Sequence, residues 1–331
     1  MHAHLTSLFL ALIIVIGAAG QANGAPLFRD DFDIDGMPDP SKWVINHPGE
    51  CWWVMGRTHF PCPEVGWTPG NFPVVEDGHL LIKHHLYNPY HLDTPKWTFL
   101  GGEVHTVMEF DPNEAYRFEA RVRLNPGDSL YVPHPDGLVT SFFLYGYDGS
   151  KSDEIDHEFV SKWINDDVTW PNGAPVLTNT WNESFQKPIV VAPEGLDLTQ
   201  WNTFRIYWDP GERVEWTWLD PLNGETSLRT ETDVSFIPDE PMALYFNFWA
   251  PCYTSWWYGC SPWDDAADSE LQPVDFLAEN EISAFEIDYV SVVRNPPPVP
   301  ALRGWGIVLL AGLLLGVPFC LSHPLSGDVG R

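Results

Sequence analysis

The sequence has little positive charge. Its 331 residues include 17 Lys and Arg against 46 Asp and Glu, which gives a formal net charge of −29. A surface this acidic repels the phosphate backbone of DNA or RNA, so we expect no nucleic-acid partner. By itself the charge indicates only a soluble, well-solvated surface.

Metal-binding motifs and long helices are also missing. No C-x-x-C or H-E-x-x-H spacing occurs, and the 12 His are scattered along the chain. Residues 31–36, "DFDIDG", begin like an EF-hand loop, but Lys42 stands where such a loop needs its closing Glu. We therefore expect no EF-hand. No stretch has the periodicity of a helix of three or more turns, and no internal repeat is present.

Cysteines are few, and their positions favour disulfides. Four of the five lie in the central region, at Cys51, Cys62, Cys252 and Cys260, and Cys320 lies near the end of the chain. Four cysteines in an exported domain suggest two disulfides, for which three pairings can be drawn. We favour the two local pairs, 51–62 and 252–260.

The two ends of the chain differ from its middle. An apolar run at 5–19 leads into "GQANGAP", which predicts a signal peptide over residues 1–24. Residues 1–6 carry no Lys or Arg, which departs from the usual signal pattern, and an N-terminal membrane anchor is the alternative. The run is short for a membrane span, however.

The C-terminal region 295–331 begins with a Pro-rich linker, "NPPPVP", and continues into a second apolar run at 305–322. That run is about long enough to enter a bilayer. The linker and the run predict a hydrophobic sorting or anchor segment. Residues 25–294 are left as one large domain.

Residues 25–294 show the pattern of an all-β protein. Short apolar or alternating runs recur between breaks at Gly, Pro, Asn and Asp. In 117–124, "RFEARVRL", the apolar and charged side chains alternate without exception. We expect an antiparallel β-sandwich. Strands are predicted at 79–86, 117–124, 138–147, 153–160, 203–209, 213–220, 242–249 and 285–293.

The strand at 153–160 would carry three carboxylates on one face. Glu154, Asp156 and Glu158 occupy alternate positions, so successive Cα atoms on that face are only ~6.5–7 Å apart. The apolar run 138–147 predicts a central strand that pairs with it. Carboxylates this close raise one another's pKa, which indicates a site that holds a proton. An acidic face without chemistry is the alternative.

The segment "DEIDHEF" resembles the active-site signature of glycoside hydrolase family 16, E-[I/L/V]-D-x-E. The resemblance extends in the expected order over 27–294 and is closest to the lichenase and xyloglucan-enzyme branch. Laminarinases belong to the same family. The other matching segments are "LFRDDFDIDGMPDPSKW", "VEDGHLLIK", "GGEVHT", "VTSFFLYGY", "WNTFRIYWDPGERVEWTWLD", "PMALYFNFWAP" and "FEIDYVSV".

This resemblance implies a concanavalin-like jelly roll with a concave substrate cleft. It implies a retaining endo-β-glycanase in which Glu154 is the nucleophile, Glu158 the general acid/base and Asp156 the helper between them. A β-1,3 or β-1,3-1,4 glucan is the first expected substrate. A β-glucan transglycosylase and a non-catalytic polysaccharide-binding surface protein are the alternatives. We expect a monomer that needs no cofactor for catalysis.

Family positions also imply how the cleft is lined. Asn and Glu side chains would bind sugar hydroxyls, and Trp249 would stack on a sugar ring. The implied substrate-binding residues are Glu103, Asn179, Tyr245, Asn247 and Trp249.

Two further points concern metal binding and departures from the family. Family members often bind one structural Ca²⁺ on the convex side, where Asp288 and the backbone of Gly78 match that site. His157 stands where the family usually has a hydrocarbon side chain, and His105 stands where an Arg is common. The departures leave the catalytic strand intact.

The tail "VPALRGWG" resembles the VPTL-type, PEP-CTERM-like sorting signals of bacteria. Ala301 replaces the usual Thr, and the chain ends in a single Arg331 rather than a cluster. The resemblance implies export, followed by anchoring at the bacterial cell surface or release. A plain C-terminal anchor is the alternative, and the tail is the only expected contact with a membrane.

Overall fold

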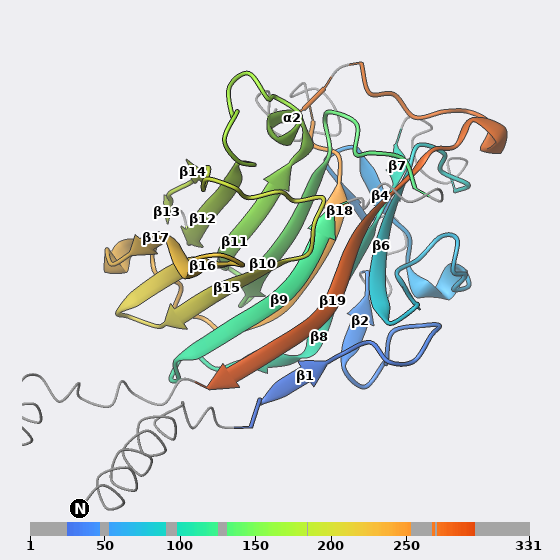
Figure 1. The fold of residues 1–331 in the computed structure, drawn as a ribbon. Helices are drawn as coiled ribbons and strands as arrows, with labels where there is room; N and C mark the ends of the chain where they lie inside the picture. Colours follow the sequence, from blue (N-terminus) through green and yellow to red (C-terminus); the bar gives the residue numbers. More distant parts are fainter. Residues whose placement is uncertain are drawn as a thin grey trace, which may run out of the picture. The chain divides into compact units, whose positions relative to one another are not determined.

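Two β-sheets, packed face to face, contain nearly all of the regular secondary structure that is described (Figure 1). The computed structural model describes residues 25–46, 53–90, 98–124, 131–183, 185–252, 267–268 and 270–294. All of them belong to the unit Met1–Arg294. The predicted signal peptide, the predicted sorting tail, Cys51 and Cys260 lie outside the described residues. The expectation of an all-β sandwich is confirmed.

The 11-stranded sheet forms one layer, and its strands pair antiparallel except for the parallel pair β4–β7. β1 (Phe28–Asp30) pairs with β19, and β5 (Val74–Glu76) pairs with β6. The remaining order is β17 (Gly224–Glu231), β16 (Arg213–Asp220), β15 (Asn202–Asp209), β9 (Tyr116–Leu124), β19 (Ile282–Arg294), β6 (His79–His85), β7 (Phe99–Leu100), β4 (Thr58–Phe60) and β3 (Trp53–Met55).

The 8-stranded sheet forms the other layer and contains the carboxylate strand, β11. β14 (Ile189–Val191) pairs with β12 outside the main order. That order is β13 (Phe185–Gln186), β12 (Val176–Asn182), β11 (Ser152–Val160), β10 (Val139–Tyr147), β18 (Met242–Trp249), β8 (Gly102–Phe110) and β2 (Trp43–Ile45). A short helix, α2 (Ser161–Ile164), follows β11. No helix in the described part of the chain is long and apolar enough to cross a membrane.

The core lies between the sheets and follows the alternation in the sequence. In β9 the even-numbered positions 116–124 are buried, and the odd-numbered positions, three Arg and one Glu, are only partly buried. β10 is buried along almost its whole length, as a central strand should be. Trp208 and Trp216 are among the largest side chains that are fully buried there. β10 and β11 pair antiparallel, so the predicted pairing of 138–147 with 153–160 is confirmed.

The start of the carboxylate strand is fixed by a buried carboxyl group, that of Asp153. Asp153 is fully buried and accepts hydrogen bonds from the backbone N–H groups of Asp239 (2.8 Å), Glu240 (3.1 Å) and Glu183 (3.3 Å). It therefore ties the start of β11 to two loops that are far away in sequence.

Removing this anchor should destabilise the fold. We expect Asp153→Ala to lower the free energy of unfolding by about 2–4 kcal/mol, because three backbone N–H groups lose their buried acceptor at once. Asp197→Ala is the control, because Asp197 makes similar bonds to Thr199 in an exposed turn. Urea unfolding of both variants measures the difference, and equal losses would contradict the anchoring role.

Candidate active site

The three carboxylates of β11 lie on one face of the 8-stranded sheet. Glu154 and Glu158 are partly exposed, whereas Asp156 is 3% exposed. Directly paired residues of neighbouring strands point to the same side, so the register identifies the neighbours of each carboxylate. They are Tyr145, Phe143 and Ser141 on β10 and Trp181, Asn179 and Leu177 on β12.

A cleft of about 450 Å³ opens over these carboxylates. One wall comes from β12 and the β13–β14 segment, and the other includes Met55 and Trp163. Its lining includes Glu154, Asp156, Glu158, Asn179, Trp181 and Trp249. The cleft therefore has carboxylates in its floor and aromatic side chains beside them.

Burial and mutual repulsion change the acidity of the triplet. Burial raises the pKa of Glu154 to about 7; the charge of Glu103 adds to this, and a hydrogen bond with Asp156 opposes it. Burial, followed by the charge of Glu154, raises the pKa of Glu158 to about 8. Burial and the charges of both Glu raise the pKa of Asp156 well above its ordinary value. The three groups titrate as one set.

This electrostatic arrangement suits acid and base chemistry at neutral pH. The triplet retains protons there, and Glu158 has the higher pKa of the two outer Glu. Cα atoms four residues apart on a strand are ~13 Å apart, and two long Glu side chains that lean together can close most of that distance. A pair with one protonated and one ionised carboxyl can donate a proton and attack a nearby carbon.

All five predicted substrate-binding residues lie on the same face as the triplet. Asn179 is paired with Asp156 on the neighbouring strand. Asn247 and Glu103 are paired across β18 and β8, and the Asn247 Nδ2 donates to Glu103 Oε2 at 3.4 Å. Tyr245 stacks on His105 with ring centroids 4.5 Å apart. The structure thus brings together residues from four strands, β8, β11, β12 and β18, around one surface.

Trp249 is covered more than its predicted stacking role requires. Its side chain is 8% exposed and packs in a cluster with Met55. A Cβ on Gly56, in the β3–β4 turn, would lie 3.0 Å from the Trp249 ring, so the turn rests on the indole. The Arg57 N–H fixes the turn by donating to the Ala250 carbonyl at 2.8 Å.

Sequence reasoning missed the more open aromatic residue of the cleft. Trp181 is partly exposed and lines the cleft from β12. The signal was present, because Trp181 lies two residues after Asn179 and must share its face on a strand. Met55 and Trp163 had no comparable signal, since neither belongs to the 8-stranded sheet.

The predicted calcium site has competing contacts. Asp288 accepts a hydrogen bond from Arg121 Nη1 at 2.6 Å, and His79 Nε2 lies 3.7 Å away. Gly78 lies in the turn before β6, with φ +76°. Within the described ranges no group of three or more His, Cys, Asp or Glu could hold a metal ion. Asp288 is thus already paired with a guanidinium, and the calcium site stays a prediction.

The predicted disulfides stay predictions. Cys62 and Cys252 are both buried in the structure. Their favoured partners, Cys51 and Cys260, lie outside the described residues.

The raised pKa of Glu158 should appear in the stability of the protein. The group contributes stability that is complete below about pH 4.5 and is lost as the pH rises through about 8. Glu158→Gln should therefore gain stability relative to the unmodified protein between pH 5 and pH 9, by at least about 1 kcal/mol. Denaturant unfolding at both pH values measures this, with the exposed Glu194→Gln as control. A difference that does not change with pH would contradict the raised pKa.

Comparison with known proteins identifies the family of this chain. A family model described as "Glycosyl hydrolases family 16" matches residues 92–265, more than half of the chain. No curated protein sequence matches it significantly. The matched segment contains β8, β10, β11, β12 and β18, which carry the triplet and the residues around it.

Solved structures share the fold at low identity. A prokaryotic β-1,3-1,4-glucanase (lichenase) derived from a mouse hindgut metagenome is 19% identical, with 81% of this chain and 99% of that chain covered and a TM-score of 0.55. The Bacillus licheniformis β-glucanase is 18% identical, with 83% and 100% covered and a TM-score of 0.54. A pseudo β-1,3-glucanase of Mycobacterium tuberculosis is 18% identical, with 82% and 100% covered and a TM-score of 0.51. Together with the match of the family model, the fold leads to one conclusion: the chain belongs to glycosyl hydrolase family 16.

Proposed function

We propose that this protein is a retaining endo-β-glycanase that hydrolyses a β-1,3 or β-1,3-1,4 glucan. The observation that carries the proposal is the triplet Glu154, Asp156 and Glu158, with its raised pKa values, in the floor of a cleft. The glucanases with the same fold support this substrate class.

The proposed reaction has two steps. Protonated Glu158 gives its proton to the glycosidic oxygen while the Glu154 carboxylate attacks the anomeric carbon, so the C–O bond to the leaving sugar breaks and a glycosyl–Glu154 ester forms. Glu158, now ionised, takes a proton from water, which attacks the same carbon and frees Glu154. Asp156 holds a shared proton beside Glu154 and eases the repulsion between the two carboxylates.

Loss of the nucleophile should abolish turnover. We expect Glu154→Gln to lower kcat by at least ~10³-fold on the best substrate. Reducing-sugar release from laminarin, lichenan, xyloglucan, agarose and carrageenan identifies that substrate, with Glu194→Gln as a surface control. Equal activity in Glu154→Gln would remove Glu154 as the nucleophile.

The pH profile should depend on Glu158. Activity requires the protonated acid, so kcat/KM should fall as the pH rises through about 8. With an aryl glycoside, whose leaving group needs little protonation, Glu158→Gln should keep part of its activity and lose this basic limb. An unchanged basic limb in the variant would assign the acid to another residue.

Product analysis separates the hydrolase from the β-glucan transglycosylase. A hydrolase gives shorter chains at every stage, whereas a transglycosylase also gives products longer than the starting oligosaccharide. Proton NMR of the first product tests retention, because a retaining enzyme releases the β-anomer from a β-glycan.

The second candidate is a non-catalytic polysaccharide-binding protein on the same fold. The observation in its favour is that one structural neighbour is described as a pseudo β-1,3-glucanase. Binding to a polymer of the panel without turnover on any of them would establish this reading in place of the enzyme.

We also propose that the protein is exported and is held at the bacterial cell surface, or released from it, through residues 295–331. The support is the signal-like segment 1–24 and the resemblance of the tail to bacterial sorting signals. Fractionation of cells that produce the full chain or a chain ending at residue 294 tests this. Equal distribution of both would contradict a role for the tail.

A further inference from the structure

His157 is buried on the core side of the carboxylate strand. It is fully buried, and its Nε2 lies 3.1 Å from the backbone carbonyl oxygen of Arg205, on β15 of the opposite sheet. Its ring stacks on Phe142 with centroids 5.7 Å apart and meets Phe204 at 5.3 Å. Between two β-sheets, where contacts are mostly hydrocarbon, it makes a polar link from one layer to the other.

The contacts of His157 define its protonation. A carbonyl oxygen can only accept, so Nε2 carries the hydrogen. Nδ1 is buried and has no hydrogen-bond partner in the structure. A proton there would place a charge among aromatic rings, and burial lowers the pKa of His157 to about 4. The ring is therefore a neutral donor at the pH at which the site works.

A second link reaches the adjacent residue of the same strand. The indole Nε1 of Trp216, on β16, donates to the backbone carbonyl oxygen of Asp156 at 2.8 Å. β15 and β16 are neighbours, and Arg205 is paired with Thr217, next to Trp216. Two consecutive residues of the carboxylate strand are thus bonded to two adjacent strands of the other sheet.

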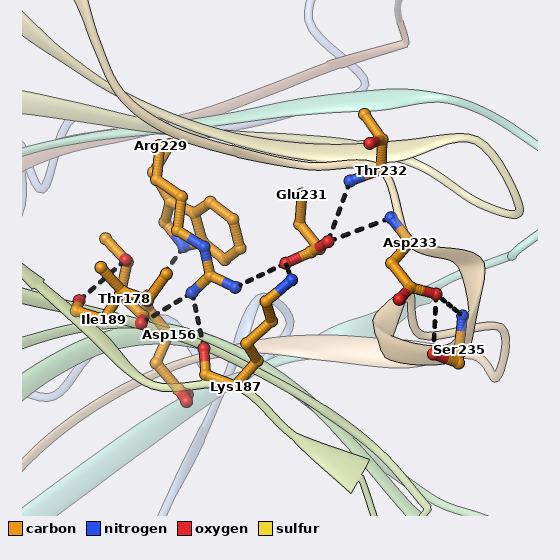
Figure 2. A network of polar contacts seen from close by, with 10 residues as sticks. Asp156, Thr178, Lys187, Ile189, Arg229, Glu231, Thr232, Asp233 and Ser235 are labelled. Atoms are coloured by element: carbon orange, nitrogen blue, oxygen red, sulfur yellow. Dashed lines mark hydrogen bonds and ion pairs between the residues drawn. The ribbon is translucent and has the colours of Figure 1, made fainter.

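Trp216 is itself held by a buried cation. The Arg229 guanidinium lies 4.6 Å from the centroid of the Trp216 ring. It also donates to the carbonyl oxygens of Thr178 (2.9 Å) and Lys187 (2.7 Å), as Figure 2 shows. Thr178 on β12 is paired with His157. The network therefore supports the carboxylate strand and its neighbour together.

The charge of Arg229 is balanced within the network. Arg229 Nη2 donates to Glu231 at 2.9 Å, and Lys187 lies 2.8 Å from the same carboxylate (Figure 2). Burial acts to raise the pKa of Glu231, but the bonds from Lys187, Asp233 N–H and Arg229 outweigh it and lower the pKa to about 2. Glu231 is ionised at any working pH and balances the charge of Arg229. The two side chains whose hydrogen bonds join the carboxylate strand to the opposite sheet, the His157 imidazole and the Trp216 indole, are both neutral.

We propose that His157 and Trp216 are positioning residues that fix the spacing of the Glu154, Asp156 and Glu158 carboxylates by tethering the Asp156–His157 segment to the opposite sheet. The inference rests on the proposed glycosidase function. Three like charges on one strand repel, and a strand that is free to bend would let them separate. Separation would lower the proton affinity of Glu158 and widen the carboxyl–carboxyl distance beyond that of a retaining enzyme.

The neutrality of the tether is part of this inference. A Lys or Arg beneath the strand would hold it equally well, but its charge would favour ionised carboxylates and cancel their raised pKa. A hydrocarbon side chain, usual at position 157, would leave the charges undisturbed but could not bond to the opposite sheet. Neutral His donates a hydrogen bond without adding a charge.

Three variants test the tether. His157→Leu and Trp216→Phe each remove one donor and keep an apolar side chain, and His157→Gln keeps a donor. Trp218→Phe is the matched control, because Trp218 is also buried and its indole donates to Asn202 Oδ1 at 3.1 Å, within the 11-stranded sheet.

We expect His157→Leu and Trp216→Phe to lower kcat ~10-fold or more with less than ~3-fold change in KM, since small displacements of reacting groups have effects of this size. The basic limb of kcat/KM should move to lower pH by at least ~0.5 unit. His157→Gln should restore the limb in part, and Trp218→Phe should leave it in place at a similar loss of thermal stability. If both test variants lose stability but keep the basic limb of kcat/KM at the same pH, the tether is an ordinary core contact and the proposal is wrong.

Nuclear magnetic resonance of the unmodified protein gives a readout that depends neither on activity nor on the folding of a variant. In the unmodified protein His157 should be the neutral Nε2–H tautomer at pH 6, and the Trp216 indole N–H should exchange slowly with solvent. An Nδ1–H tautomer would overturn the tether. If no polymer is turned over, a ¹³C titration of the Glu carboxyls in His157→Leu still decides. A highest carboxyl pKa below that of the unmodified protein supports the tether, and an unchanged value refutes it. Failure of the proposed function is thereby separated from failure of the tether.

Discussion

Repulsion between three carboxylates on one strand is the constraint on which the rest of this site depends. Side chains at alternate positions of β11 point the same way and have no choice of direction. The cleft removes much of the water that would screen them, so burial and mutual repulsion both act to keep protons bound. Acid–base chemistry near neutral pH requires carboxyls that keep a proton. Repulsion between three carboxylates also destabilises the strand, however, unless its backbone is held in place. The contacts that anchor β11 are therefore needed because of the carboxylates that it carries.

The anchors act at both the start and the middle of the strand. At the start of the strand Asp153 accepts hydrogen bonds from three backbone N–H groups. In its middle Asp156 and His157 are hydrogen-bonded across the core. On either side β10 and β12 form continuous ladders with β11. A strand fixed in this way cannot relieve the repulsion by twisting. The repulsion therefore persists and keeps the pKa values of the carboxyls raised.

Features that follow the alternation of side chains along one strand, or that come from a neighbouring segment, could be predicted from the sequence. Alternation placed Glu154, Asp156 and Glu158 on one face and His157 on the other, and the apolar run before them predicted their neighbour β10. The sequence could not show that Trp216 bonds to Asp156 or that Met55 covers Asn247, because these contacts join residues 60 and 192 positions apart and leave no periodic trace. Trp249 was placed on the correct face, but the turn that covers it comes from the other sheet. The calcium prediction took Asp288 from its position in the family, whereas its partner Arg121 lies on another strand.

The hairpin β3–β4 has a consequence for how the cleft responds to ligand. Its strands belong to the 11-stranded sheet through β7, yet its turn lies on Trp249 of the 8-stranded sheet. The floor of the cleft and one of its walls are therefore parts of different layers, and any sliding of one layer over the other changes the width of the cleft. A sugar chain held between them would resist that sliding. Bound substrate would thus act as a mechanical cross-link of the sandwich, stiffening a region much larger than the surface it touches.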